Sequence, residues 1–317
     1  MSAGMDLGSD IVVFDVPMRL KFRGQVRRSG ILMRGAGGWA EFSPFPDYDA
    51  ETCARWLDAA REIAELGFPT PVRDRVPVNT TVPAVDATTA YELVRASGCA
   101  TAKVKVAETG QTLADDLARV EAVRDALGPQ GKLRVDANAA WTVDEAVPAL
   151  KALDAFSLEY AEQPVRTLEE MAQLRRRVDV LLAADESVRR AEDPVRVAGL
   201  EAADIVVLKV QPIGGIRRCL EVAEACGLPV VVSSAVETSI GIAAGVALAA
   251  ALPELPYACG LGTVSLLAAD VTSQPLLPVD GELAVGAVEP DLELVHADDD
   301  VREWWLARME ASSSAGR

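Results

Sequence analysis

Five charged residues in the middle of the chain carry its most specific chemical signal: Lys105, Asp136, Glu162, Asp185 and Lys209. Each stands at the C-terminal end of a short apolar run, and the steps between them are 31, 26, 23 and 24 residues. A step of that size holds about one strand and one helix, so a repeating fold can bring all five side chains to one rim. Three carboxylates between two ammonium groups suit a metal ion that binds a carboxylate substrate and a lysine that removes the proton from the adjacent carbon.

The segments around these residues indicate what positions them. Short β-branched runs alternate with stretches rich in Ala, Leu, Glu and Arg, and several stretches begin with Asp or Thr and end in Gly, as capped helices do. The runs begin near residues 76, 101, 133, 158, 181, 204, 228 and 257. This pattern predicts a parallel (β/α) TIM-type barrel, with an open doubly wound sheet as the alternative. The chain contains neither the dinucleotide-binding glycine fingerprint nor a phosphate-binding loop that would support a nucleotide site.

The two ends of the chain follow a different pattern, which predicts a capping domain. Two runs in the first 75 residues, IVVFDVPMRLKF and SGILMRGAGGWAEFSP, alternate like paired strands, and a helical stretch follows at Glu51–Leu66. We therefore predict an α+β capping domain over residues 1–75, completed by residues 274–317, with the catalytic barrel over residues 76–273. The tail predicts a strand pair near Asp280 and a last helix near DVREWWLARMEA.

Two finer expectations concern this tail. Either Trp304 or Trp305 in the last helix is expected to contact the N-terminal unit as a core residue. The final segment, ASSSAGR, is expected to be disordered because it is polar, small and terminal.

Composition excludes several classes of function. The net charge is −17, with 48 acidic against 31 basic residues, which opposes nucleic-acid binding. The five cysteines are irregularly spaced without a CxxC pair, which favours free thiols in a reducing cytoplasm. The N-terminus lacks the features of a signal peptide, and the longest apolar stretch, Ile240–Pro253, is too short to span a membrane and predicts a buried helix. We therefore expect a cytoplasmic protein without a nucleic-acid or membrane partner.

The only histidine, His296, lies in an acidic tail segment. Because this one histidine lies far along the chain from the strand ends, in a segment typical of a solvated loop, the sequence argues against several kinds of site. These are Ser-His-Asp and Cys-His nucleophiles, histidine-ligated zinc and a histidine general base. Acid–base chemistry is left to lysine, carboxylate, tyrosine or cysteine.

The five charges also have a plainer interpretation. Taken singly, each acid suits a helix N-cap or a surface charge, and Lys209 suits the exposed end of a strand. Three acids in step, with a strand-end lysine on either side, favour a shared site instead. The two-residue period of a strand adds neighbours on the same face: Lys103 with Lys105, and Arg134 and Asn138 with Asp136. A second ammonium group and a metal ion would lower the pKa of a lysine toward neutrality, so that it can act as a base.

Several of these pieces resemble the enolase superfamily and, within it, the o-succinylbenzoate synthases of menaquinone biosynthesis. The matching segments are AKVKV, RVDANAAW, LEYAEQP, AADES, DIVVLKVQPIGG and VVSSAVETSIG, together with GWAEFSPFPDYD in the N-terminal unit. The resemblance runs from about residue 11 to about residue 285 and implies the modified (β/α)7β barrel with a capping domain. It implies Mg²⁺-dependent dehydration of 2-succinyl-6-hydroxy-2,4-cyclohexadiene-1-carboxylate to 2-succinylbenzoate through a metal-stabilised enediolate, as the superfamily pairs a lysine base with Mg²⁺.

The same resemblance implies a role for each candidate residue. Mg²⁺ would be held by Asp136, Glu162 and Asp185. Lys105 would remove the proton and then help hydroxide to leave, while Lys209 would stay cationic on the opposite face. The remaining candidates would tune Lys105, contact the substrate or metal-bound water, or lie near the succinyl end: Lys103, Arg134, Asn138, Ser233 and Ser234.

Two alternatives stay open at this point. A racemase of N-acylamino acids or a dipeptide epimerase uses the same two opposed lysines, one for each face of the substrate. A non-catalytic barrel serving as a scaffold is a different class, but it would have lost a ligand or a lysine, and here the set is complete. The short cap segment at residues 17–30 leaves closure over the site and substrate selectivity open, and the sequence is silent on oligomeric state.

Overall fold

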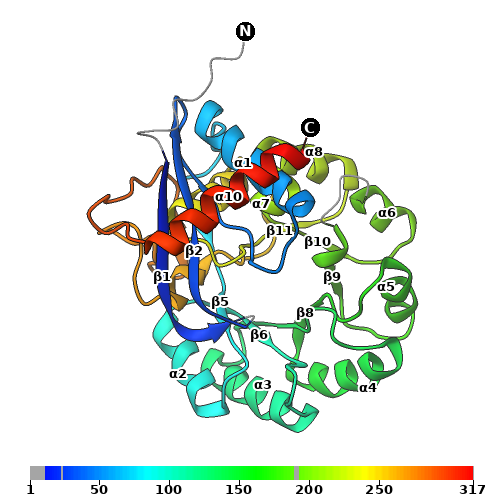
Figure 1. The fold of residues 1–317 in the computed structure, drawn as a ribbon. Coiled ribbons are helices and arrows are strands. Elements are labelled where there is room, and N and C mark those ends of the chain that lie inside the picture. The colour runs from blue at the N-terminus through cyan, green and yellow to red at the C-terminus, as the bar shows by residue number, and fades with distance from the viewer. Residues whose placement is uncertain (1–10, 23, 189–192, 317) are drawn as a thin grey trace.

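The computed structural model describes residues 11–22, 24–188 and 193–316, and its core is a curled sheet of parallel strands (Figure 1). The strands follow one another in the sheet in chain order, which confirms the predicted barrel and excludes the doubly wound alternative. They are β5 (Thr80–Val82), β6 (Thr101–Lys105), β7 (Lys132–Asp136), β8 (Leu158–Glu162), β9 (Leu182–Ala184), β10 (Ile205–Leu208) and β11 (Val230–Val232).

A short extended segment closes the barrel between its first and last strands. Cys259 forms a parallel bridge with Val78, and Gly260 forms one with Ser233. The N–H of Asn79 donates to the Cys259 carbonyl at 2.9 Å, and the N–H of Gly260 donates to the Val232 carbonyl at 2.8 Å. The eighth run expected near residue 257 is therefore present as this bridging segment.

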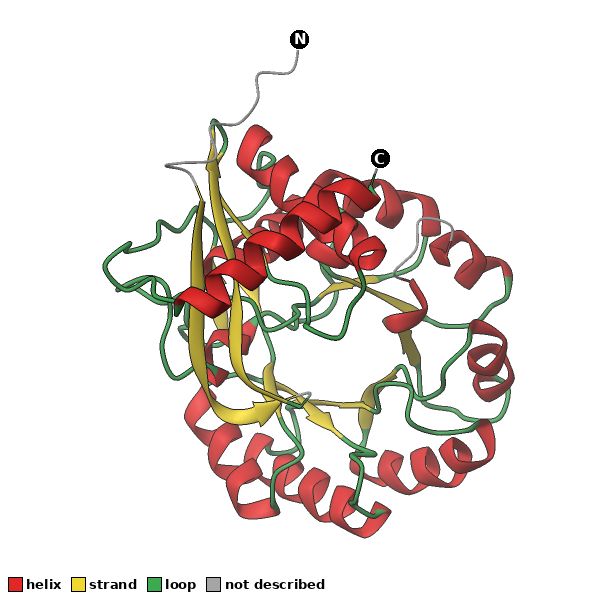
Figure 2. Ribbon diagram, viewed as in Figure 1, coloured by secondary structure: helices red, strands yellow, loops and turns green. Residues whose placement is uncertain are grey.

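Helices cover the outside of the barrel, as Figure 2 shows in red around the yellow strands. They are α2 (Ala87–Ser97), α3 (Leu113–Leu127), α4 (Val143–Leu153), α5 (Leu168–Arg175), α6 (Asp193–Gly199), α7 (Val210–Ile213), α8 (Ile216–Cys226) and α9 (Ser239–Ala251). Capping boxes begin α3, α4 and α5, with Thr112, Thr142 and Thr167 as the N-caps. Because threonines cap these helices, Asp136 and Glu162 at the ends of the preceding strands are not N-caps.

Alternate residues along the strands face either the helices outside the barrel or the interior of the barrel, and each set forms its own apolar cluster. Outward-facing residues such as Val104 and Val135 join the large core between sheet and helices. Tyr160, Val207 and Val231 belong to a separate buried apolar cluster. Each of these three stands two residues before a polar residue at the rim, so this cluster forms the floor of the barrel beneath the site.

An antiparallel sheet of β1 (Ile11–Phe22), β2 (Gln25–Gly35) and β3 (Gly38–Phe42) packs with α1 (Ala50–Leu66) beside the barrel (Figure 1). The Gly-rich turn between β2 and β3 approaches the end of α1 closely. A Cβ on Gly37 would lie 2.1 Å from the backbone nitrogen of Gly67, so only glycine fits at this position.

The C-terminal tail returns to this N-terminal unit. β12 (Glu282–Ala284) pairs antiparallel with β4 (Arg75–Pro77), and α10 (Asp299–Ala315) packs against α1. Trp305 is the core contact: it is buried and meets the Phe42 ring edge-on at 5.9 Å, whereas Trp304 is 43% exposed. The boundaries at residues 75 and 274 stay a prediction.

The expected disorder of the final segment is wrong up to residue 315, because α10 continues through it. Ser312 is buried and its hydroxyl donates to the Arg308 carbonyl at 2.8 Å. The Arg61 guanidinium donates to the Ser313 hydroxyl at 2.9 Å. These contacts offset the low helix propensity of a serine run. The predicted helix near Ile240 is α9, which is buried along nearly its whole length, and none of the described helices is long and apolar enough to cross a membrane.

Candidate active site

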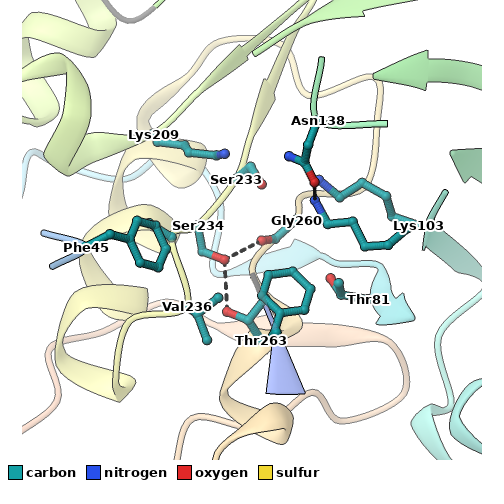
Figure 3. Close-up of a pocket in the computed structure, with 13 residues that line it drawn as sticks. Phe45, Thr81, Lys103, Asn138, Lys209, Ser233, Ser234, Val236, Gly260 and Thr263 are labelled. Carbon is teal, nitrogen blue, oxygen red and sulfur yellow. Dashed lines mark hydrogen bonds between the residues drawn. The ribbon is translucent and has the colours of Figure 1, made fainter. Parts of the chain in front are cut away.

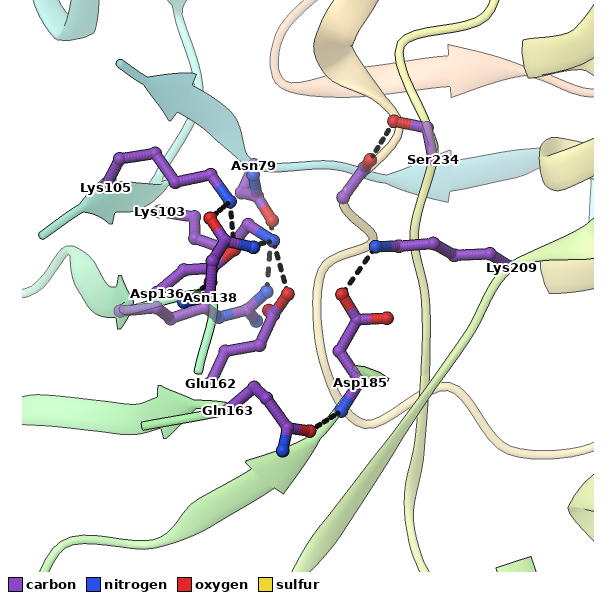
Figure 4. Close-up of polar contacts among 12 residues, drawn as sticks. Asn79, Lys103, Lys105, Asp136, Asn138, Glu162, Gln163, Asp185, Lys209 and Ser234 are labelled. Atoms are coloured by element: carbon purple, nitrogen blue, oxygen red, sulfur yellow. Dashed lines mark hydrogen bonds and ion pairs between the residues drawn. The ribbon is translucent and has the colours of Figure 1, made fainter. Parts of the chain in front are cut away.

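The strand ends bring the predicted lysines and acids together at one rim, in two hydrogen-bonded groups that face each other (Figure 4). The Lys103 ammonium lies 2.7 Å from Glu162 Oε1 and 3.0 Å from Asp136 Oδ2. Lys105 Nζ lies 2.5 Å from Asp136 Oδ2, and Lys209 Nζ lies 2.5 Å from Asp185 Oδ2. Figure 4 shows Lys103 and Lys105 on one side of the site and Lys209 on the other.

The three acids are almost completely buried. Asp136, Glu162 and Asp185 are each 1% exposed, and Lys103 and Lys209 are also buried. Charges removed from water in this way are stable only with partners, so a surface role for them is excluded.

Burial and neighbouring charge move the pKa values of these groups apart. Burial raises the pKa of Glu162 to about 7, with the Asp136 charge adding to it and Lys103 opposing it. Burial would also raise the pKa of Asp136, but Lys103 and Lys105 outweigh it and hold the value well below the usual range.

The two neighbouring lysines separate in the same way. Burial would lower the pKa of Lys103, but Asp136 and Glu162 outweigh it and raise the value well above the usual range. Burial lowers the pKa of Lys105, and the Lys103 charge lowers it further against the attraction of Asp136. Lys103 therefore holds its proton more firmly, and Lys105 is the group that gives up its proton more readily.

The donor set fits a hard divalent cation. Three carboxylates come from the ends of three neighbouring strands, and oxygen ligands of this kind suit Mg²⁺. Glu162 Oε2 is buried and has no hydrogen-bond partner, which is the environment a bound cation satisfies. Among the described residues no three acidic, cysteine or histidine side chains are gathered closely enough to hold a metal ion as they stand. Each of the three carboxylates is instead paired with a lysine.

A pocket opens above these side chains (Figure 3). It encloses about 400 Å³ of empty space, part of which is open to solvent. Figure 3 shows Phe45, Val236 and Lys209 facing Lys103 and Asn138 across it. The remaining lining residues are Phe22, Thr81, Lys105, Ser233, Ser234, Ala235, Gly260 and Thr263. A small molecule entering here meets both lysine-bearing sides at once.

Comparison with known proteins identifies the family. A family model described as enolase C-terminal domain-like matches residues 86–290, and one described as enolase N-terminal domain-like matches residues 13–64. The chain is 61% identical over 303 residues to an o-succinylbenzoate synthase of Thermobifida fusca, covering 95% of each chain. It is 51% identical over 318 residues to an o-succinylbenzoate synthase of Mycolicibacterium smegmatis, covering 98% of each chain. The chain belongs to the o-succinylbenzoate synthase family of the enolase superfamily.

A solved structure of similar shape extends the comparison. The crystal structure of dipeptide epimerase from Enterococcus faecalis matches with a TM-score of 0.72 at 25% identity, covering 87% of this chain and 96% of that one. Members of the enolase superfamily generally require a divalent metal ion.

The pocket is lined by three of the polar residues predicted to contact the substrate or to support the site: Asn138, Ser233 and Ser234. Asn138 Oδ1 accepts a hydrogen bond from Lys105 at 2.6 Å, and its backbone N–H donates to Asp136 Oδ1 at 3.0 Å. The Ser234 hydroxyl donates to the Gly260 carbonyl at 2.9 Å. Asn138 therefore orients Lys105, whereas Ser234 stabilises the closing segment of the barrel.

Arg134 requires a correction, because it neither lines the pocket nor contacts Lys105. Its Nε donates to Glu159 Oε2 at 2.6 Å, its Nη1 donates to the Ala258 carbonyl at 2.7 Å, and its guanidinium lies 4.6 Å from the Tyr160 ring centroid. It precedes Asp136 by two residues, which places it about 7 Å deeper in the barrel. Arg134 belongs to the floor of the o-succinylbenzoate synthase barrel, not to its substrate surface.

The capping domain and the barrel supply pocket and supporting residues that strand spacing did not reveal. Phe22 at the end of β1 lines the pocket, and Lys105 Nζ lies 5.3 Å from its ring centroid. Phe45 follows β3 and lines the same pocket. Gln163 holds Asp185 from behind by accepting a hydrogen bond from its backbone N–H at 2.9 Å. The match of GWAEFSPFPDYD to the family offered a signal for Phe45, and Phe22 lies in the cap segment at residues 17–30, whose closure over the site the sequence left open.

Proposed function

We propose that this chain is an o-succinylbenzoate synthase, which dehydrates 2-succinyl-6-hydroxy-2,4-cyclohexadiene-1-carboxylate to 2-succinylbenzoate. The observation that carries the proposal is 61% identity over 95% of the chain to a relative of that name. A complete set of two opposed lysines and three buried acids at one rim of the barrel supports it. We also propose Mg²⁺ as the metal, held by Asp136, Glu162 and Asp185.

The lysines carry the proton chemistry in this proposal. When bound, the cation supplies positive charge beside the substrate carboxylate, which makes the neighbouring C–H group more acidic. Lys105, as the neutral amine, takes the proton from the ring carbon that bears the carboxylate. The electron pair of that bond is first delocalised onto the carboxylate and then forms the new ring double bond as the C–O bond to the hydroxyl on the next carbon breaks. Lys105 then gives the proton to the departing hydroxide, so that water leaves and the amine is restored.

The other residues set the charge and position of the reactants. Lys103 remains protonated and keeps the pKa of Lys105 low, while Asn138 orients the Lys105 amine. Lys209 faces the opposite side of the substrate as an ammonium and stabilises the negative charge that develops on the carboxylate. Ser233 and Ser234 lie on the wall that we assign to the succinyl end.

A direct assay tests the function. Purified protein with Mg²⁺ and the cyclohexadiene substrate should produce 2-succinylbenzoate, measured by its aromatic absorbance and by chromatography. EDTA should abolish the activity, and added Mg²⁺ should restore it. A protein that forms no 2-succinylbenzoate with Mg²⁺ present would refute the proposal.

The opposed lysines also favour a second candidate, racemisation of N-acylamino acids or epimerisation of dipeptides. A lysine on each side of the pocket is what proton exchange at one carbon requires, and the fold is shared with a dipeptide epimerase. In heavy water such an enzyme incorporates deuterium at the α-carbon, so mass spectrometry of a panel of N-acylamino acids and dipeptides decides the question. A panel without exchange leaves dehydration alone.

We propose a cytoplasmic location for the enzyme. All five cysteines are free and buried, which suits a reducing compartment. Fractionation of cells followed by immunoblotting of each fraction locates the protein directly, and its recovery outside the cytoplasmic fraction would refute the proposal.

A further inference from the structure

The loop after β11 forms a wall of the pocket in an unfavourable backbone conformation. Ser233, Ser234, Ala235 and Val236 line the pocket, and Val236 has φ of 63°. A β-branched side chain avoids this left-handed region, so a valine adopts it only where the surroundings hold it. The contacts of this wall loop, residues 233–238, show what does so.

Arg28 on β2 of the capping sheet holds the wall loop by its backbone. Its Nε donates to the Val236 carbonyl at 3.0 Å, and its Nη2 donates to the Ser43 carbonyl at 2.7 Å. The guanidinium also lies 4.6 Å from the ring centroid of Phe45, another pocket residue. Arg28 is 2% exposed, so these hydrogen bonds form away from competing water. A single cap side chain thus joins two parts of the pocket wall.

Glu41 on β3 holds the other end of the wall loop. Its Oε2 accepts hydrogen bonds from the backbone N–H of Thr238 and of Gly241, each at 3.1 Å, and from the Thr238 hydroxyl at 2.5 Å. A Cβ on Gly241 would lie 2.9 Å from this oxygen and 2.5 Å from Glu237 Cβ, so glycine makes the close approach possible. Glu41 therefore fixes the start of α9, where the wall loop ends.

Residues of the barrel complete the same cluster from within. Glu237 Oε2 accepts a hydrogen bond from the Ala235 N–H at 2.6 Å. Gln211 Nε2 donates to Glu237 Oε1 at 3.3 Å, while Gln211 Oε1 accepts from the Ser43 N–H at 3.1 Å. Barrel and cap groups thus bond to one another as well as to the wall loop.

We propose that Arg28 and Glu41 are positioning residues through which the capping domain sets the shape of the substrate pocket at the wall loop. The inference rests on the proposed function for the identity of the substrate. The lysines and acids come from β6 to β10, whereas the wall loop follows β11. Loss of the cap contacts therefore weakens the fit of the substrate and leaves the proton chemistry largely in place.

Steady-state kinetics of the Mg²⁺-loaded full-length protein tests the inference. Arg28→Met keeps the length of the side chain without its donors, and we expect KM to rise at least tenfold while kcat changes less than threefold. Arg27→Met is the matched control: the Arg27 side chain is 52% exposed, bonds to Asp15 on the neighbouring strand of the cap and does not line the pocket, so both constants should stay within twofold. A fall in kcat without a rise in KM, or an equal effect of both variants, overturns the inference.

Hydrogen exchange gives a readout that needs no substrate, so it separates failure of this inference from failure of the proposed function. The amides of Ala235, Thr238 and Gly241 should exchange at least tenfold faster in Arg28→Met and in Glu41→Gln, while peptides from β6 keep the native rate. Arg28→Lys, which keeps the charge and one donor, serves if the methionine variant does not fold, and it should show a smaller increase. Native exchange rates across residues 233–241 in these variants overturn the inference.

A double variant tests the link to backbone strain. Glycine adopts positive φ without penalty, so Val236→Gly should reduce the dependence of the wall loop on Arg28. We expect Arg28→Met to raise KM at least tenfold in the native background and less than threefold in the Val236→Gly background. The same ratio in both backgrounds contradicts the role of Arg28 in holding Val236.

Discussion

A buried ion pair on α3 supports the strand end that carries Lys105, and its loss should be costly. Arg119 Nη1 lies 2.9 Å from Asp116 Oδ1 and donates to the Lys105 carbonyl at 2.9 Å, and its Nε donates to the Val85 carbonyl at 2.6 Å. Asp116 Oδ2 accepts a hydrogen bond at 2.9 Å from the N–H of Ala107, which has φ of 59°. The pair therefore fixes the backbone on both sides of the β6 terminus.

The structure sets the size of the effect of Arg119→Met. The side chains of Arg119 and Asp116 are 1% and 3% exposed, and removing one partner of a buried pair costs about 3–5 kcal/mol. Burial already raises the pKa of Asp116 against the influence of Arg119, so without the guanidinium the carboxyl group takes up a proton more easily and limits the loss. We therefore expect a loss of about 3 kcal/mol in the free energy of unfolding near neutral pH.

A second ion pair of the same spacing provides the control. Arg218 and Glu221 form an i,i+3 pair on α8, as Asp116 and Arg119 do on α3, but their side chains are 43% and 66% exposed. An exposed helix pair contributes about 0.5 kcal/mol or less, so Arg218→Met should be nearly neutral. The two substitutions then differ in burial and in the backbone carbonyls that Arg119 alone reaches.

Urea unfolding followed by circular dichroism measures both variants, and kinetics measures the consequence for Lys105. A strand end displaced by about 1 Å should lower kcat roughly 10- to 100-fold in Arg119→Met and leave it unchanged in Arg218→Met. If the two variants lose stability equally, to within about 0.5 kcal/mol, the argument from burial is refuted. If Arg119→Met loses stability but keeps native kcat, the pair supports the fold and does not position Lys105.

Three further predictions follow from the same structure. Lys105→Ala should lower turnover roughly 10²- to 10⁴-fold and keep the native circular dichroism spectrum. Lys151→Ala, at an exposed position of α4, should leave turnover unchanged. Full activity of Lys105→Ala would exclude Lys105 from the mechanism. Trp305→Ala should lower the free energy of unfolding in urea by about 3–5 kcal/mol and Trp304→Ala by about 1 kcal/mol, because only the first ring is buried; equal losses would contradict the assigned packing. Burial and Glu237 raise the pKa of Glu41 from 4.5 to about 7, so this group alone should cost the native protein up to about 3 kcal/mol as pH rises from about 4.5 to about 7. Glu41→Gln should remove that contribution and leave the part due to Glu162; a slope equal to that of the native protein would refute it.

Local rules account for the part of the fold that the sequence predicts well. Alternation along a strand places Lys103 and Lys105 on one face, and threonine capping boxes mark the starts of α3, α4 and α5. Parallel strands joined in chain order then bring their C-terminal ends to one rim. The two-residue period is a property of each short segment, and the topology follows from the order of the segments. Their spacing is therefore enough to place the acids and lysines at one rim.

Depth within the barrel is harder to predict than direction. Arg134 shares a face with Asp136, yet it lies in the floor because each pair of residues along a strand descends by about 7 Å. Its partners are Glu159 on the next strand and the Ala258 carbonyl on the closing segment. The closing segment pairs with its neighbours only through isolated bridges, and its sequence carries a weak strand pattern. That pattern does not predict which side chains bond to its carbonyl groups.

Contacts between the cap and the barrel are the least accessible to sequence reasoning, and they bear on what the enzyme accepts. Arg28 and Val236 are separated by 208 positions, and the N–H of Gly241 bonds to Glu41 across 200 positions. No period or spacing links residues so far apart, because their approach depends on how two independently formed sheets dock. The chemistry of this enzyme is thus set by strand ends with a regular spacing, whereas the shape of its pocket depends on long-range docking. Relatives can therefore share the lysines and acids at the strand ends and still differ in substrate. We expect such differences to lie first in the residues of the wall loop.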